Sequence, residues 1–308
     1  MPRSTTLAAG LLIIAAGCSS GGSRLTFLDL PRKAKAATGA TGDAMLIRAP
    51  EGDSVSLSEA VAALSDADVV FLGEQHDNGL GHAVQFALTE ALAKQRGEII
   101  LSLEMLERDA QPTVDLYLRG AISETEFKRL ANLWPNYDEH YRAAVEFCKR
   151  HGYPVLAANV YRPIASKIAK KGLVAGAGDA WAAQTVTAPA DGEYRRRFNE
   201  IMGSHRDSMD AASLDNVFAA QCVKDDTMAE SIAEALAAAP STGPRPQVIH
   251  WNGRFHSDFA LGTVERLKTR RPDLNIAVVS MLERAVAPAS PITEEELRRG
   301  DFLIVAPQ

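Results

Sequence analysis

The sequence predicts an α/β fold with a mostly parallel sheet flanked by helices, and with a helical cap or insertion. Short apolar runs typical of buried strands alternate with stretches in which apolar residues recur at helical spacing. The strand-like runs cover 69–72, 99–103, 154–158, 248–251, 275–281 and 302–306. An Ala-rich segment over about 175–239 has helical periodicity and no such run, so we expect the cap or insertion there.

The first residues have the features of an export signal. Arg3 precedes an apolar stretch of about ten residues, which suits a signal peptide and is too short to span a bilayer. The segment 15–18 resembles a bacterial lipobox in which Cys18 carries the lipid, although leucine is preferred where Ala15 stands. An ordinary secretory signal is the alternative. The expected parts are a lipoprotein signal peptide (1–17), a flexible tether (18–43) and one folded domain (44–308).

Capping and breaking residues mark the helices of the domain. Ser56 or Ser58 is placed to cap a first helix, and Gly97 ends the helix after the first strand. Ser123 and Glu126 have the spacing of a capping box. Helical patterns after the first strand cover about 81–95, 110–118, 124–133, 138–150, 163–171 and 258–270. Because strands and helices alternate, we expect right-handed crossovers between parallel strands.

Charged and imidazole side chains stand at the ends of three predicted strands. Glu74 and His76 follow the first strand, Glu104 follows the second, and His256 lies beyond the fourth. The carboxyl ends of parallel strands meet at the edge where ligands bind, so we expect these four residues to converge. Such a set suits a divalent metal, acid–base chemistry, or a structural network of mutual hydrogen bonds. All three interpretations stay open at this point.

Composition and motifs argue against several classes of protein. The net charge of −6, and the lack of a Lys/Arg run longer than 195–197, argue against a nucleic-acid surface. The sequence has no Cys-x-x-Cys, which disfavours thiol redox chemistry, thiolate zinc sites and covalent haem attachment. Cys148 and Cys222 lie in amphipathic patterns and are expected in the core. No Gly-x-Ser-x-Gly elbow is present in the expected folded domain, 44–308, which disfavours a serine hydrolase.

The segment 72–78, Leu-Gly-Glu-Gln-His-Asp-Asn, together with His82 and Gln85, resembles the signature of ChaN-like haem-binding lipoproteins. Their superfamily also includes Tiki-type metalloproteases and erythromycin esterases. Further matches follow in order: Leu103-Glu104-Met105 with Arg108-Asp109; Tyr141; Ala158-Asn159 with Arg162; Gln221 with Asp226, Met228 and Ala229; and Gly253 with His256, Gly262 and Arg266-Leu267. Two positions depart from many relatives, which have Pro where Tyr161 stands and Gly-x-Gly-His at 253–256.

The resemblance implies a haem- or iron-linked role at the bacterial cell envelope. Its implied partners are haem and, through the lipid anchor, a membrane; a homodimer is left open. If the source has two membranes, Ser19 beside Cys18 points to the outer one. The rival function that the superfamily implies is a metal-dependent hydrolase. It would use Glu74, His76, Glu104 and His256 as catalytic or metal-binding residues.

Four residues are candidates to hold the haem. Haem iron takes an axial Tyr, His, Met or Cys, and the propionates need cations. Tyr161 leaves the third strand at the same sheet edge as His76, and Arg162 beside it is placed to meet a propionate. Tyr141 is the competing axial ligand, and His82 lies near the start of a helix. For each tyrosine, a packing role is the alternative.

Overall fold

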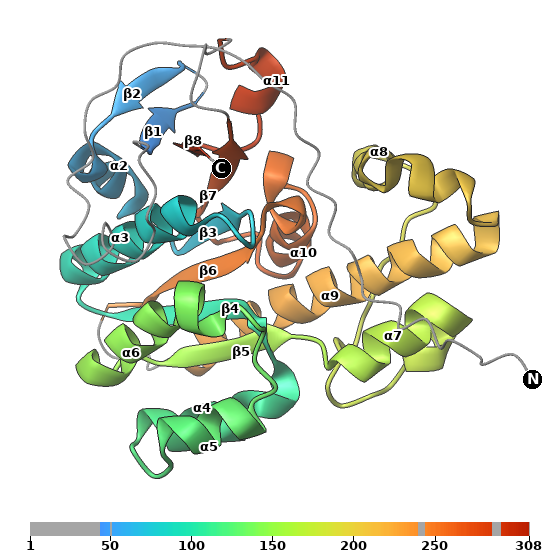
Figure 1. The fold of residues 1–308 in the computed structure, drawn as a ribbon, viewed down its shortest axis with the longest axis horizontal. Coiled ribbons are helices and arrows are strands. Elements are labelled where there is room, and N and C mark those ends of the chain that lie inside the picture. Colours follow the sequence, from blue (N-terminus) through green and yellow to red (C-terminus); the bar gives the residue numbers. More distant parts are fainter. Residues whose placement is uncertain (1–43, 50, 240–243, 285–290, 308) are drawn as a thin grey trace, which may run out of the picture.

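The computed structural model describes residues 44–49, 51–239, 244–284 and 291–307. Within them, a sheet of eight strands in the order β2-β1-β8-β7-β3-β6-β4-β5 forms the centre of the domain, with helices on both sides (Figure 1). The strands are β1 (Met45–Arg48), β2 (Asp53–Val55), β3 (Val69–Glu74), β4 (Ile99–Glu107), β5 (Val155–Asn159), β6 (Gln247–Gly253), β7 (Ile276–Glu283) and β8 (Phe302–Ala306). Neighbours from β8 to β5 pair in parallel, which confirms the predicted α/β class. The predicted signal peptide, the tether and Cys18 lie outside the described residues.

One edge of the sheet is antiparallel. Strand β1 pairs antiparallel with both β2 and β8. Neither β1 nor β2 was predicted from the sequence, because strands of four and three residues are too short to show a period of two.

The α-helices in the described residues are α2 (Leu57–Leu64), α3 (Gly79–Arg96), α4 (Gln111–Leu118), α5 (Glu124–Leu130), α6 (Arg142–His151), α7 (Arg162–Lys171), α8 (Glu193–Asp207), α9 (Ala211–Ala238), α10 (Thr263–Arg270) and α11 (Glu294–Leu297).

Strand β3 is covered by helices on both faces. Val70 and Leu72 pack in the hydrophobic cluster that includes α2, α3 and α6. Val69 and Phe71 pack on the other face, with α9 and α10. Because alternate residues point to opposite faces, burial on both sides explains the continuous apolar run.

Helix starts follow the predicted caps. Ser56, rather than Ser58, caps α2, and Ser123 caps α5; both form complete capping boxes. Pro163 lies in the first turn of α7, where the absence of its N–H costs no helical hydrogen bond. Gly172 follows the end of α7 with a φ of 85°, a conformation that favours glycine.

The expected helix over 258–270 is shorter in the structure. It begins only at Thr263. Phe259, Ala260 and Gly262 have φ values of 62°, 56° and 57°, outside the range that a right-handed helix can use. A turn with positive φ values therefore replaces the first part of the predicted helix.

The expected helical segment over about 175–239 contains α8 and α9, but residues 177–192 form neither helix nor strand. In Figure 1, α9 is the long helix that runs from α8 to the sheet. Ala229, Ile232 and Leu236 of α9 pack against the sheet in the same cluster as Val248. Part of this segment is therefore a layer of the core rather than a cap.

Neither cysteine in the described residues is paired. Cys148 and Cys222 are buried free thiols, and burial raises the pKa of each to about 12. Both are therefore uncharged packing residues at neutral pH. Within the described ranges, no helix combines the length and the hydropathy needed to cross a membrane.

Candidate functional site

The candidate site lies at the carboxyl edge of the sheet, where β3, β6 and β4 are neighbours. Glu74 ends β3 and is in register with Gly253, the last residue of β6. Glu104 lies in β4, on the other side of β6, and His256 ends the 3-10 segment η4 (Arg254–His256) directly after β6. Because β6 lies between β3 and β4, residues from three distant parts of the sequence meet at one place.

Glu74 is the centre of the first half of the site. Its side chain is buried, and its Oε1 accepts hydrogen bonds from the Tyr141 hydroxyl and, at 2.9 Å, from His76 Nδ1. Gln85 Nε2 donates to Oε2 at 3.1 Å. Burial alone would raise the pKa of Glu74, but two neighbouring histidines, His82 and His76, and the Tyr141 hydroxyl outweigh it and lower this pKa to about 2.

His82 is buried beside Glu74, and both of its ring nitrogens face oxygen atoms. Nδ1 lies 2.8 Å from Gln85 Oε1, and Nε2 lies 3.2 Å from the carbonyl oxygen of His76. The ring also stacks on His140, with the centroids 4.4 Å apart. In this arrangement neither nitrogen is open to an iron, so the cofactor role of His82 stays a prediction that these contacts do not support.

Glu104, His256 and Asp225 form the second half of the site. The Gly253 N–H donates to Glu104 Oε2 at 2.7 Å, and His256 Nε2 lies 3.5 Å from Oε1. On its other side, His256 Nδ1 lies 2.8 Å from Asp225 Oδ1. Burial opposes ionisation of Asp225, but His256 and Arg266 outweigh it and lower the pKa of this carboxyl. The buried carboxylate thus fixes the orientation of the His256 ring.

His76 connects the two halves through Gly253. A Cβ atom on Gly253 would lie 2.9 Å from His76 Cε1 and Nε2 and 3.6 Å from Glu104 Oε2. The imidazole therefore lies against the glycine backbone, beside Glu104. Burial opposes protonation of His76, but the hydrogen bond and charge of Glu74, with the charge of Glu104, raise its pKa. The structure thus brings Glu74, His76, Glu104 and His256 together.

These side chains bind one another rather than forming an evident set of metal ligands. In the part of the chain that the structure describes, no group of three or more His, Cys, Asp or Glu side chains is arranged to hold a metal ion. The geometry favours the network of mutual hydrogen bonds. Within this network, His76 is placed for acid–base chemistry. Its Nδ1 is hydrogen-bonded to Glu74, while its Nε2 has no hydrogen bond to a described residue.

Replacing Gly253 with Ala is expected to displace the His76 ring and weaken its hydrogen bond to Glu74. The new methyl group would meet the ring at 2.9 Å, a contact that must relax. The backbone at Gly253 has a φ of −56°, which alanine adopts, so the fold should remain. An NMR pH titration of the imidazole protons should show the raised pKa of His76 moving down. An unchanged pKa in a folded variant would contradict this geometry.

The two tyrosine candidates differ in accessibility. Tyr141, in the π-helical turn η2 (Tyr137–Tyr141), is buried and donates its hydroxyl hydrogen to Glu74. Burial, together with Glu74, raises the pKa of Tyr141 well above its usual value. The predicted role of Tyr141 as an axial ligand is therefore not supported. Tyr161 follows β5 and is only partly buried, and its side chain makes no hydrogen bond among the described residues.

A partly exposed apolar residue lies beside Tyr161. Its N–H donates to the carbonyl oxygen of Trp181 at 3.4 Å, and the Trp181 residue is 42% exposed. On the polar side, the backbone N–H of Arg162 donates to Glu107 at 2.9 Å, and its side chain lies 3.4 Å from the same carboxylate. Tyr161 thus has an apolar neighbour and a charged neighbour next to it.

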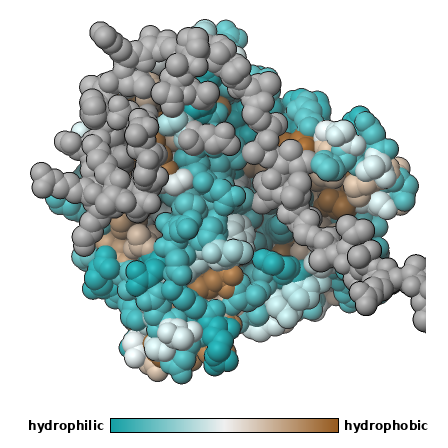
Figure 2. Space-filling model, in the orientation of Figure 1, coloured by the Kyte–Doolittle hydropathy of each residue, from teal (hydrophilic) through white to brown (hydrophobic). Residues whose placement is uncertain are grey.

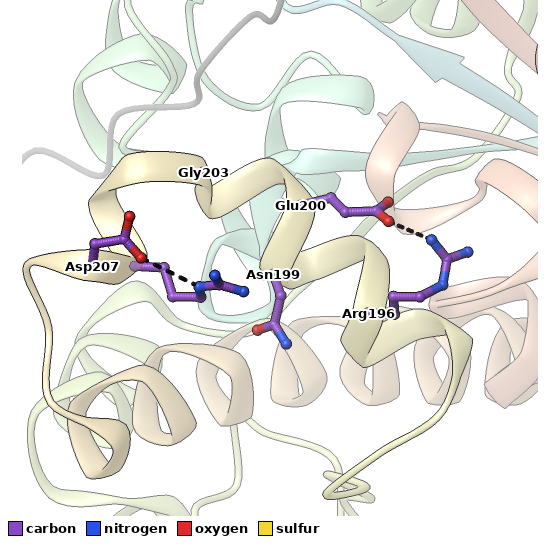
Figure 3. Close-up of a pocket in the computed structure, with 6 residues that line it drawn as sticks. Arg196, Asn199, Glu200, Gly203 and Asp207 are labelled. Carbon is purple, nitrogen blue, oxygen red and sulfur yellow. Dashed lines mark hydrogen bonds and ion pairs between the residues drawn. The ribbon is translucent and has the colours of Figure 1, made fainter.

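A surface hollow on α8 does not involve the candidate residues. It is lined by Arg196, Asn199, Glu200, Gly203, Arg206 and Asp207 (Figure 3). Arg196 pairs with Glu200, and Arg206 Nε lies 3.7 Å from Asp207. The charges in the hollow therefore neutralise one another. Among the residues coloured in Figure 2, most of those on this face are hydrophilic, and hydrophobic residues occur in small separate areas.

Two acidic residues of the site were not among the candidates predicted from the sequence. Asp225 orients His256, and Glu107 accepts the N–H beside Tyr161. Asp225 carries a signal that is visible in the sequence: the charged run 224–226 interrupts an apolar helical pattern. Acidic residues are seldom buried unless paired, so such a run in a core helix indicates buried partners.

Comparison with known proteins gives one family match. The family described as haem-binding uptake, Tiki superfamily, ChaN, matches residues 60–267. The solved structure of ChaN of Campylobacter jejuni, described as showing cofacial haem binding, is 19% identical, with a TM-score of 0.67 over 86% of this chain and 98% of that one. The open conformation of a mutant erythromycin esterase, EreC, is 13% identical, with a TM-score of 0.46 over 86% and 83% of the two chains. A comparison with curated protein sequences found no match.

Proposed function

We propose, from the premise that this chain belongs to the ChaN family of haem-binding uptake proteins in the Tiki superfamily, that it binds haem at the carboxyl edge of its sheet and that Tyr161 is the axial ligand. The observation that carries the proposal is the family match over 60–267, which includes the whole candidate site. Tyr161 is chosen because Tyr141 is buried and its hydroxyl is used by Glu74.

The residues around Tyr161 fit the chemistry of haem. A phenolate oxygen is an established axial ligand, and the porphyrin needs apolar contacts while its propionates need cations. Tyr161 has the partly exposed Trp181 bonded to its backbone and Arg162 next to it in the chain. Bound haem would place an iron at the tyrosine oxygen, and the carboxylate of Glu107 would hold the backbone next to that ligand in place.

Replacing Tyr161 with Phe is expected to weaken haem binding at least tenfold, because it removes the only oxygen of this side chain that can bind iron. Absorbance titration of the soluble domain, 44–308, measures the shift of the Soret band as haem is added. The wild-type domain should show the shift at near-stoichiometric haem. Tyr153→Phe is the matched control, since Tyr153 packs against Phe147 and His151, which lie outside the site. If the wild-type domain shows no Soret shift up to roughly 50 µM haem in the same titration, the proposed function is contradicted.

The proposed location is the cell envelope, where a lipid on Cys18 anchors the protein and haem binding serves iron acquisition. The lipobox-like segment 15–18 supports this location, and Ser19 supports the outer membrane if the source has two. Replacing Cys18 with Ser is expected to move the full-length protein from the membrane fraction to the soluble fraction, because the lipid supplies the membrane affinity. Quantitative fractionation checks the result, and a variant that stays membrane-bound would contradict the anchor.

A metal-dependent hydrolase is the second candidate function. The observation that favours it is His76, a histidine held by Glu74 with its other nitrogen unbonded, since this is how a general base is oriented. A divalent ion at Glu74, His76, Glu104 and His256 remains a proposal. Elemental analysis of the protein as purified would decide it, because a resident ion appears at near one equivalent per chain.

A further inference from the structure

Lys224 lies on α9 between residues that belong to two parts of the site. Val223, before it, packs in the cluster that includes Val160 and borders Tyr161. Asp225, after it, holds His256. Consecutive helical residues point about 100° apart, so Lys224 projects between the directions of its two neighbours. Its backbone is therefore fixed next to both the tyrosine candidate and the Glu–His network.

The charge of Lys224 acts on both parts of the site. The ammonium group is close enough to interact electrostatically with His76 and with Glu107. Glu107 in turn accepts the backbone N–H of Arg162, the residue after Tyr161. Lys224 is thus within electrostatic range of both the carboxylate beside Tyr161 and the imidazole that follows β3.

Among the described residues, Lys224 has no hydrogen bond and no ion pair, although it is partly buried. Other cations near the site are engaged by partners. Arg108 binds Glu230 and Ser231, Arg254 binds Asp258, Arg266 binds Asp226, and Arg162 is 3.4 Å from Glu107. A partly buried ammonium without a partner has lost some of its hydration, so an added anion gains more from meeting it than from an exposed lysine.

We propose that Lys224 binds a carboxylate of the ligand that Tyr161 holds, which for haem is a propionate. The inference rests on the proposed function and extends it, because it assigns the recognition of the ligand's acidic side to one residue. An ammonium group on a flexible stem donates up to three hydrogen bonds and adapts to a carboxylate. Lys224 then selects porphyrins with free propionates over those whose propionates are neutral.

The test compares haem with its dimethyl ester, in which both carboxylates are neutral. Soret titrations are run with the wild-type domain, with Lys224→Met, which keeps the length of the stem and removes the charge, and with Lys224→Arg, which restores it. The control is Lys170→Met, the same chemical change at an exposed position in the last turn of α7. Circular dichroism confirms that each variant is folded, and Lys224→Gln is the substitute if Lys224→Met is not.

The wild-type domain is expected to prefer haem over the ester by about tenfold or more, because a charge-assisted hydrogen bond is lost with the ester. Lys224→Met should bind both porphyrins with similar affinity, whereas Lys224→Arg and Lys170→Met should keep the preference. A preference that survives in Lys224→Met, or a wild type that binds the two porphyrins equally, overturns this inference and leaves the proposed function standing. A wild type that binds neither porphyrin overturns both.

Discussion

Replacing Asp225 with Ala is expected to lower the free energy of unfolding by about 3–5 kcal/mol, because it removes one partner of a buried charged network. Asp225 is fully buried, and its oxygens accept hydrogen bonds from His256 Nδ1, the Thr263 hydroxyl and the Tyr194 hydroxyl. The Arg266 guanidinium lies 4.0 Å away. Without the carboxylate, these donors stay buried and have no acceptor to replace it.

Asp215→Ala is the matched control for this experiment. Asp215 lies on the same helix, α9, but its side chain is 66% exposed and pairs with Arg195 at the surface. A surface ion pair contributes about 0–1 kcal/mol, so this variant should unfold close to wild type. Urea unfolding followed by circular dichroism measures both. Equal midpoints for the two variants would show that the Asp225 network adds no more stability than a surface pair.

The parallel core of the fold could be predicted from the sequence because its strands are buried on both faces. Runs such as 69–72 are apolar without interruption, and helices with clear caps separate them. The antiparallel strands β1 and β2 escaped prediction because a few residues give no periodic signal. The turn before α10 escaped because its left-handed residues include Phe259 and Ala260, types that rarely adopt positive φ.

The sequence predicted the site residues that stand at the ends of predicted strands. Glu74 ends β3, His256 follows β6, and Glu104 comes directly after the last residue of β4 that pairs with β6, so the rule for parallel sheets places them at one edge. What the rule does not give is which side chain bonds to which. Tyr141 comes from a π-helical turn and Asp225 from the middle of a long helix, and both reach the site through tertiary packing.

The second large effect is expected in acid. Because of His250, the free energy of unfolding should fall by about 4–5 kcal/mol between pH 6.5 and pH 3. His250 is fully buried in β6; its Nδ1 lies 2.8 Å from Ser102 Oγ, and its Nε2 has no hydrogen-bond partner in the described structure. Burial, with the charge of nearby His256, lowers the pKa of His250 from 6.5 to about 3. The folded protein therefore keeps this ring neutral in a range where the unfolded chain protonates it.

The sign of this effect follows from proton binding. Below pH 6.5 the unfolded state holds one proton more than the folded state at His250, so stability falls by about 1.4 kcal/mol for each pH unit. The fall ends near pH 3, where the folded state also takes up the proton. Glu74, with a pKa of about 2, adds a further loss as pH falls from 4.5 toward 2, because the unfolded chain protonates its carboxyl first. Comparison with a variant that lacks only His250 separates the two.

His250→Asn removes the titrating ring and keeps a polar group that can bond to Ser102. Its free energy of unfolding, measured in urea from pH 7 to pH 4, should fall less steeply than that of wild type by about 1.4 kcal/mol for each pH unit below 6.5. His205→Asn, at an exposed position of α8, is the control and should follow the wild-type slope. The loss at Glu74 is common to all three proteins, so it cancels in the difference. Parallel curves for wild type and His250→Asn would mean that folding does not change proton binding at His250, against the burial that the structure shows.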